Sequence, residues 1–190
     1  MFTIARRSIL AATVLFAAAS PCVAQSTLSA EDAAQLRASL LGDLEVMRGK
    51  FVGLAQAFPQ DKYNWRPMEG VRSVAEVLML AAFEGYSFIP NSFGGKPADL
   101  GGREVAAKLR ALADQAQVIE HINKGFAHAK SQIEALDPGV IGASRNLFGQ
   151  NRTATSIGLM VFGDLHEHLG QLIAYARMNQ VVPPWSKKEG

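Results

Sequence analysis

The stretch TATSIGLMVFGDLHEHLGQLIAYARMN, from Thr153 to Asn179, decides the fold of this chain. Its apolar residues recur every three or four positions, which places them in one stripe along an α-helix. Asp164, His166 and His168 lie within this segment and form the densest cluster of potential metal ligands in the sequence. The segment therefore predicts a long helix that carries both a core face and a candidate site. The stripe consists of Leu159, Val161, Phe162, Leu165, Leu169, Leu172, Ile173 and Ala176.

The rest of the sequence predicts more helices of the same kind. Ser29 with Asp32, and Ser73 with Glu76, have the spacing of helix-capping pairs. No run alternates apolar and polar residues, so we expect no sheet. Long helices joined by two longer connections predict an all-α four-helix bundle in a single domain, residues 25–190. The other predicted helices span about 30–57, 74–88 (ended by Ile89-Pro90), 103–111 and 114–136, and the two connections are 91–102 and 140–152.

Three glycines interrupt the first predicted helix: Gly42, Gly49 and Gly53. Each weakens an α-helix by up to about 1 kcal/mol relative to alanine. We expect close packing against a neighbouring helix to compensate.

Residues 1–24 have the features of a secretory signal peptide. The pair Arg6-Arg7 precedes an apolar run that is shorter than the roughly 20 residues of a membrane span. Small residues before a cut after Ala24 complete the pattern, and the arginine pair is weakly similar to a twin-arginine signal. The sequence thus predicts a periplasmic or secreted protein that is not held in the membrane after cleavage.

Cleavage changes the charge and the chemistry that the chain can support. The segment contains two of the 19 lysine and arginine residues, so 17 remain against 17 acidic residues. A net charge of zero gives no reason to expect nucleic acid as a partner. Cys22 is the only cysteine and is removed as well, which excludes a disulfide or a thiolate ligand in the mature chain.

Spacing limits which of the clustered residues can bind one ion together. Asp164 and His168 are four residues apart and share a helix face, whereas His166 points roughly the opposite way. A catalytic zinc-type site needs three protein ligands and an open position. Glu76 and Glu84 of the second predicted helix are candidate third donors. A structural role, in which each histidine makes one hydrogen bond, stays open at this point, and it is our interpretation of His121 and His128.

Two segments resemble the DinB superfamily of four-helix bundles: NWRPMEGVRSVAEVL (64–78) and HEHLGQLIAYARMNQVVPPWS (166–186). The match is most specific at Trp65-Arg66-Pro67, at Arg72 to Glu76, and at His168 to Gln171 with Tyr175 and Arg177. The resemblance implies a small helical bundle, often with a zinc or nickel ion held by three histidines. In some branches it implies metal-dependent transfer to low-molecular-weight thiols. We expect Tyr175 and Arg177 to contact the loop that holds Trp65.

The ligand pattern that the resemblance implies is only partly present. His168 matches the last ligand, and Asp164 occupies the position of the ligand four residues earlier. The second-helix ligand falls on Leu80, which cannot coordinate a metal ion. A complete site would need Glu84, Glu76 or His166 in its place.

Three functions are consistent with these observations. The first is an exported, diverged DinB-like protein with an incomplete metal site that binds a small molecule or acts in a stress response. The second is a transferase or hydrolase that uses zinc or nickel bound by Asp164, His168 and Glu84. The third is a structural homodimer paired through the first and last helices. The substrate is not identified by the sequence.

Overall fold

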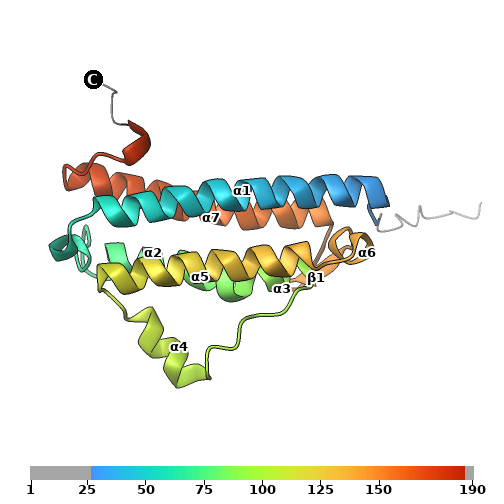
Figure 1. Ribbon diagram of the computed structural model, residues 1–190, viewed down its shortest axis with the longest axis horizontal. Helices are drawn as coiled ribbons and strands as arrows, with labels where there is room; N and C mark the ends of the chain where they lie inside the picture. Colours follow the sequence, from blue (N-terminus) through green and yellow to red (C-terminus); the bar gives the residue numbers. More distant parts are fainter. Residues whose placement is uncertain (1–26, 187–190) are drawn as a thin grey trace, which may run out of the picture.

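Two long helices, α1 (Ala30–Ala57) and α7 (Ala154–Met178), lie side by side in the computed structural model, which describes residues 27–186 (Figure 1). Both pack against a second layer formed by α2 (Val74–Phe83) and α5 (Gln115–Glu134). The predicted all-α four-helix bundle is therefore confirmed. The predicted signal segment 1–24 lies outside the described residues.

Side-chain caps begin the helices where the sequence predicted. The Ser73 hydroxyl accepts a hydrogen bond from the Glu76 backbone N–H, and the Glu76 carboxylate accepts one from the Ser73 N–H at 2.6 Å. Ser29 caps α1 by accepting from the Asp32 N–H. These bonds satisfy backbone donors that have no partner inside a helix.

The second helix does not end at Pro90, as predicted, but continues to Phe93. After α2 comes a π-helical turn, η2 (Glu84–Phe88), and then α3 (Ile89–Phe93). Proline has no backbone N–H and leaves a carbonyl of the preceding turn without its helical donor. The Tyr86 carbonyl accepts instead from the Ala98 N–H at 2.7 Å, so the helical path can pass through the proline.

The connection from α3 to α5 contains a short helix that lies outside the two layers of the bundle. α4 (Arg103–Arg110) projects below the other helices and packs against α2 (Figure 1). None of its residues is buried. The sequence predicted this helix, and the structure shows that it contributes no buried side chain to the core.

The connection from α5 to α7 contains a small sheet, so the prediction of no sheet was wrong. α6 (Pro138–Ile141) is followed by an antiparallel hairpin of β1 (Arg145–Leu147) and β2 (Gln150–Arg152). Its turn residues, Phe148 and Gly149, both have positive φ, as a type I′ turn requires. Two single-turn helices, η1 (Gln60–Lys62) and η3 (Pro184–Ser186), complete the elements.

Six of the eight residues in the apolar stripe of α7 are buried; Ile173 is half-buried and Leu159 is exposed. Leu159 keeps 75% of its surface exposed, because the stripe is wider than the face that meets α1 and α2. The expected packing of the α1 glycines was also wrong for two of the three. Gly42 and Gly49 have open space around them, whereas Gly53 contacts Pro184.

In the described part of the chain, no helix combines the length and apolar content that a membrane crossing requires. Pairing of two copies through α1 and α7 stays a prediction.

Candidate metal centre

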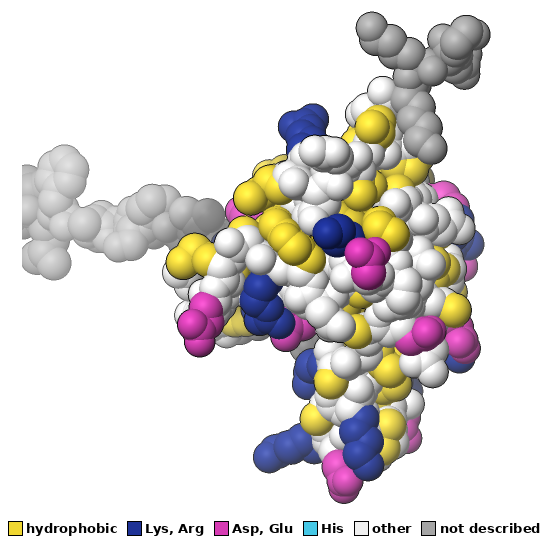
Figure 2. Space-filling model, turned by 90° about the vertical axis from the view of Figure 1, so that its left-hand side faces the viewer, with side chains coloured by type: hydrophobic (Ala, Val, Ile, Leu, Met, Phe, Trp, Pro, Cys, Tyr) yellow, Lys and Arg dark blue, Asp and Glu magenta, His cyan; other side chains and the backbone are white. Residues whose placement is uncertain are grey.

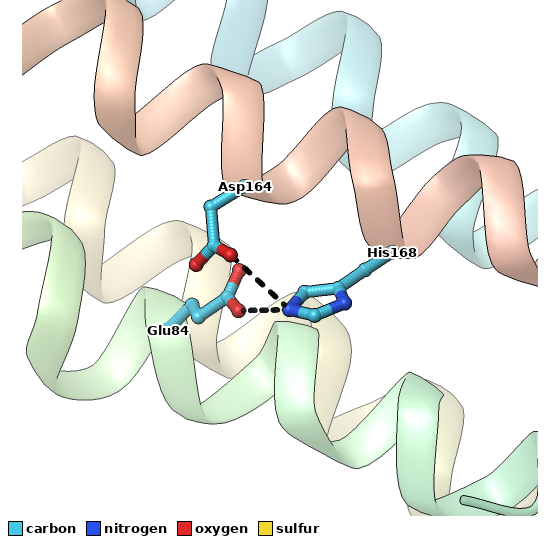
Figure 3. A group of neighbouring side chains, drawn as sticks. All are labelled: Glu84, Asp164 and His168. Atoms are coloured by element: carbon cyan, nitrogen blue, oxygen red, sulfur yellow. Dashed lines mark ion pairs between the residues drawn. The ribbon is translucent and has the colours of Figure 1, made fainter. Parts of the chain in front are cut away.

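Glu84, Asp164 and His168 meet between the second and the last helix (Figure 3). The Glu84 Oε1 atom lies 3.0 Å from His168 Nε2, and Asp164 Oδ1 lies 3.6 Å from the same nitrogen. One donor atom from each of the three residues lies within 4.8 Å of the other two. The two carboxylates point toward each other and toward the imidazole, the arrangement that a shared cation would require.

The backbone fixes Glu84 at this place. It is the first residue of η2, whose defining bond runs from the Ile89 N–H to the Glu84 carbonyl. The next residue, Gly85, packs against the backbone of Gly125 on α5 so closely that an added Cβ would stand 2.9 Å from the Phe126 nitrogen. A π-helical turn often marks a functional position, because the inserted residue redirects side chains.

One oxygen of the Glu84 carboxylate has no partner. Only 6% of this side chain is exposed, and Oε2 makes no hydrogen bond within the described residues. A buried carboxylate oxygen without a partner is costly, whereas a cation in contact with it would remove that cost. The donor set, one imidazole and two carboxylates, suits several divalent metals, so the residues present fit a metal ion.

The protonation of the cluster follows from burial and from its one short hydrogen bond. Burial raises the pKa of Glu84, and the Asp164 carboxylate adds to that increase, while the bond to His168 opposes it. The hydrogen bond to Glu84 raises the pKa of His168 above its usual value, against the effect of burial and of the positive charge of Arg72. The metal-free cluster therefore favours holding a proton between Glu84 and His168.

The remaining candidate ligands lie elsewhere. Leu80 is half-buried one turn before Glu84 and lines a cavity. Glu76 is occupied by the Ser73 backbone and by Arg66, whose Nη2 is 3.2 Å away. His166 is exposed on the α1 side of α7. Of the three substitutes considered for Leu80, only Glu84 reaches the centre.

The other two histidines make one hydrogen bond each, consistent with structural roles. The Nδ1 atom of His121 is 2.9 Å from the Tyr86 hydroxyl, and His128 Nε2 is 2.9 Å from the Lys96 carbonyl oxygen. Neither belongs to a metal-ligand cluster within residues 27–186.

Tyr175 contacts the loop of Trp65, as expected. Its ring packs edge-on against Trp65 with 5.3 Å between centroids, and its hydroxyl donates to the Arg72 carbonyl at 3.0 Å. Arg110, which no sequence pattern indicated, lines the same cavity as Arg72 and Leu80. Arg110 ends α4, whereas Arg72 lies in the loop before α2. The two residues belong to different elements, so no helical spacing in the sequence predicts that they line one cavity.

No curated protein and no solved structure matches the chain. A family model does match it, that of the DinB superfamily, over residues 43–172. The matched range includes Glu84, Asp164 and His168 and most of the four-helix bundle. This protein belongs to the DinB superfamily.

Proposed function

We propose that this protein binds a divalent metal ion through Glu84, Asp164 and His168 and acts on a small molecule at that centre, as a transferase or hydrolase. Three protein ligands leave coordination positions free, which is the pattern of catalytic rather than structural sites. Glu84 supplies the donor that Leu80 cannot.

The unpartnered Oε2 atom of Glu84 carries the proposal. A buried ionisable group without a full set of partners is unusual in a bundle core. Here it lies beside two further donors on α7, and a cation would satisfy all three residues at once.

The three proposed ligands differ in how far their side chains are exposed to solvent. Glu84 is nearly inaccessible, whereas 16% of the His168 side chain and 40% of the Asp164 side chain are exposed. Solvent can therefore reach the centre at Asp164 and His168, while Glu84 anchors it from the core. A bound divalent ion of this kind lowers the pKa of a water or thiol and so supplies a nucleophile.

A metal-free binding protein is the second candidate. The 3.0 Å hydrogen bond between Glu84 and His168 favours it, since each group partly neutralises the other without a metal ion. Leu80 in the cavity wall also favours it, because this side chain adds apolar surface rather than a ligand.

Calorimetric titration of untagged, EDTA-treated protein with zinc, nickel and manganese chlorides separates the two candidates. We expect one ion per chain, with binding lost in Glu84→Gln and in His168→Ala. His166→Ala is the matched control, since that histidine lies on the same helix outside the centre, and it should bind like the wild type. No binding by the wild-type protein, or equal loss in the control, would exclude the metal centre and leave the metal-free candidate.

We also propose that the protein works outside the cytoplasm, on the basis of the signal-like segment 1–24. N-terminal sequencing of the protein recovered from the periplasm or medium should begin at Gln25. An intact Met1 terminus on cytoplasmic protein would contradict export.

A further inference from the structure

A cavity of about 450 Å³ lies along α2 and reaches to within one helical turn of Glu84 in the candidate metal centre. Its walls come from the loop before α2, from α2 itself and from the end of α4. Leu80, one helical turn before Glu84, lies in its wall, so the cavity and the centre share the face of one helix. Its volume is in the range of pockets that bind small organic molecules.

The charged side chains in the cavity wall are predominantly positive. Arg66, Arg72 and Arg110 line it together with a single carboxylate, that of Glu76. Glu76 pairs with Arg66 and accepts from the Ser73 backbone, so its charge is already compensated. Among residues 27–186, no carboxylate lies within ion-pair distance of Arg72 or Arg110.

The Arg110 side chain and the Arg72 backbone each have a contact that leaves the guanidinium N–H groups available. The guanidinium carbon of Arg110 lies 4.3 Å from the ring centroid of Phe83, the residue before Glu84. The backbone of Arg72 is fixed by the hydrogen bond from Tyr175. Stacking on an aromatic ring orients an arginine while its N–H groups stay available to an anion.

The end of the molecule that Figure 2 shows carries no broad positive face. Lysine, arginine and acidic side chains are interspersed on the end of the molecule that Figure 2 shows, with apolar side chains between them. Arginine binds carboxylate and phosphate groups through paired hydrogen bonds. Met79 and Leu80 add apolar surface to the same wall. A small cavity with two free cations and an apolar side fits a small amphipathic anion better than a nucleic acid.

We propose that the substrate of the metal centre is a small organic anion, whose carboxylate or phosphate group is bound by Arg72 and Arg110 while its apolar part packs on Met79 and Leu80. This inference rests on the proposed function, because it names the substrate class for that centre. The contact between the anion and the two arginines requires no metal ion, so anion binding and metal binding can be tested separately.

The test uses simple probes on EDTA-treated, full-length mature protein, so that no probe can bind a metal ion. Octanoate and octyl phosphate are titrated by calorimetry beside octanamide, which has the same chain as octanoate without its charge. We expect one of the two anions to bind at least about tenfold more tightly than the amide. The preferred anion shows whether the substrate group is a carboxylate or a phosphate.

Variants assign the binding to the two arginines. Arg72→Gln and Arg110→Gln should each weaken binding of the preferred anion about tenfold, the scale of one lost charge-assisted contact. Arg103→Gln is the matched control, since it removes a positive charge from α4 outside the cavity wall. Circular dichroism should show all three variants folded, because these side chains are exposed.

Each outcome has a defined meaning. Equal binding of the anions and the amide, or unchanged anion binding in both cavity variants, overturns the inference. Anion binding that survives in His168→Ala while metal binding is lost supports it independently of the metal centre. Metal binding with no preference for either anion leaves the proposed function standing and refutes only the substrate class.

Discussion

Replacing Gly125 by alanine tests the contact that places Glu84. An alanine Cβ at this position would overlap the Ala82 carbonyl oxygen and stand 3.0 Å from its carbonyl carbon. Both atoms belong to the backbone of α2, so no side-chain rotation can relieve the overlap. The variant can fold only if α5 moves away from the second helix.

Two opposing effects set the change in stability of the Gly125→Ala variant. Alanine is favoured over glycine inside a helix by about 1 kcal/mol. Overpacking a well-packed interface costs about 1–3 kcal/mol, and contact with rigid backbone points to the upper end. The net loss should be about 2 kcal/mol, which for a domain of this size lowers Tm by roughly 4–8 °C.

Thermal unfolding followed by circular dichroism measures this effect, with Gly49→Ala as the matched control. Gly49 is exposed within α1 and an added Cβ meets nothing within 4 Å, so that variant should gain about 1 kcal/mol. Gly125→Ala should also bind metal ions more weakly, because moving α5 removes the close packing of Gly125 against Gly85 that holds Glu84 in place. A Gly125→Ala protein as stable as Gly49→Ala would show that the two helices do not approach this closely.

Three further predictions concern single residues. Ser73→Ala removes a helix cap and should lower the free energy of unfolding by about 0.5–2 kcal/mol in denaturant titrations. Tyr63→Phe should lower the free energy of unfolding by only about 1 kcal/mol in the same assay, because the Ala55 carbonyl keeps its bond from Gln115. In the wild-type protein, spectrophotometric titration should find the Tyr63 pKa at about 12, raised by burial. Burial lowers the pKa of His121 below its usual 6.5, so the unfolded chain binds a proton first as the pH falls. Wild-type Tm should therefore drop more steeply than that of His121→Gln below about pH 6.5, and parallel profiles would contradict this.

The architecture was predictable because helical periodicity repeats along most of the chain. Ser73 and Glu76 marked the start of the second helix correctly, since a capping box is a local signal. The end of that helix was not predictable in the same way. Proline normally stops a helix, and the bond from Ala98 that replaces the missing donor joins residues twelve positions apart.

The hairpin was missed for a related reason. Its strands are three residues each, too short for alternation to be visible, and its turn places a phenylalanine, Phe148, at positive φ. An asparagine at that position would have been a recognisable turn signal.

The candidate centre was predictable in part. The spacing of Asp164 and His168 indicated a shared face, and Glu84 was one of several donors considered. Choosing Glu84 over Glu76 required tertiary information, namely the salt bridge of Glu76 with Arg66 and the entry of Glu84 into the core. Arg110 reaches the cavity from a different segment, so sequence spacing carried no information about it.

The hydrogen bond of Tyr175 fixes the distance between His168 and the loop of Arg72. His168 and Tyr175 are two turns apart on one straight segment, a separation of about 10 Å along its axis. Because the Tyr175 hydroxyl donates to the Arg72 carbonyl, α7 fixes the distance between the candidate centre and the loop of Arg72. Insertions elsewhere in the loops would leave this spacing unchanged, so the distance that the proposed substrate would have to span is set by the most regular element of the fold.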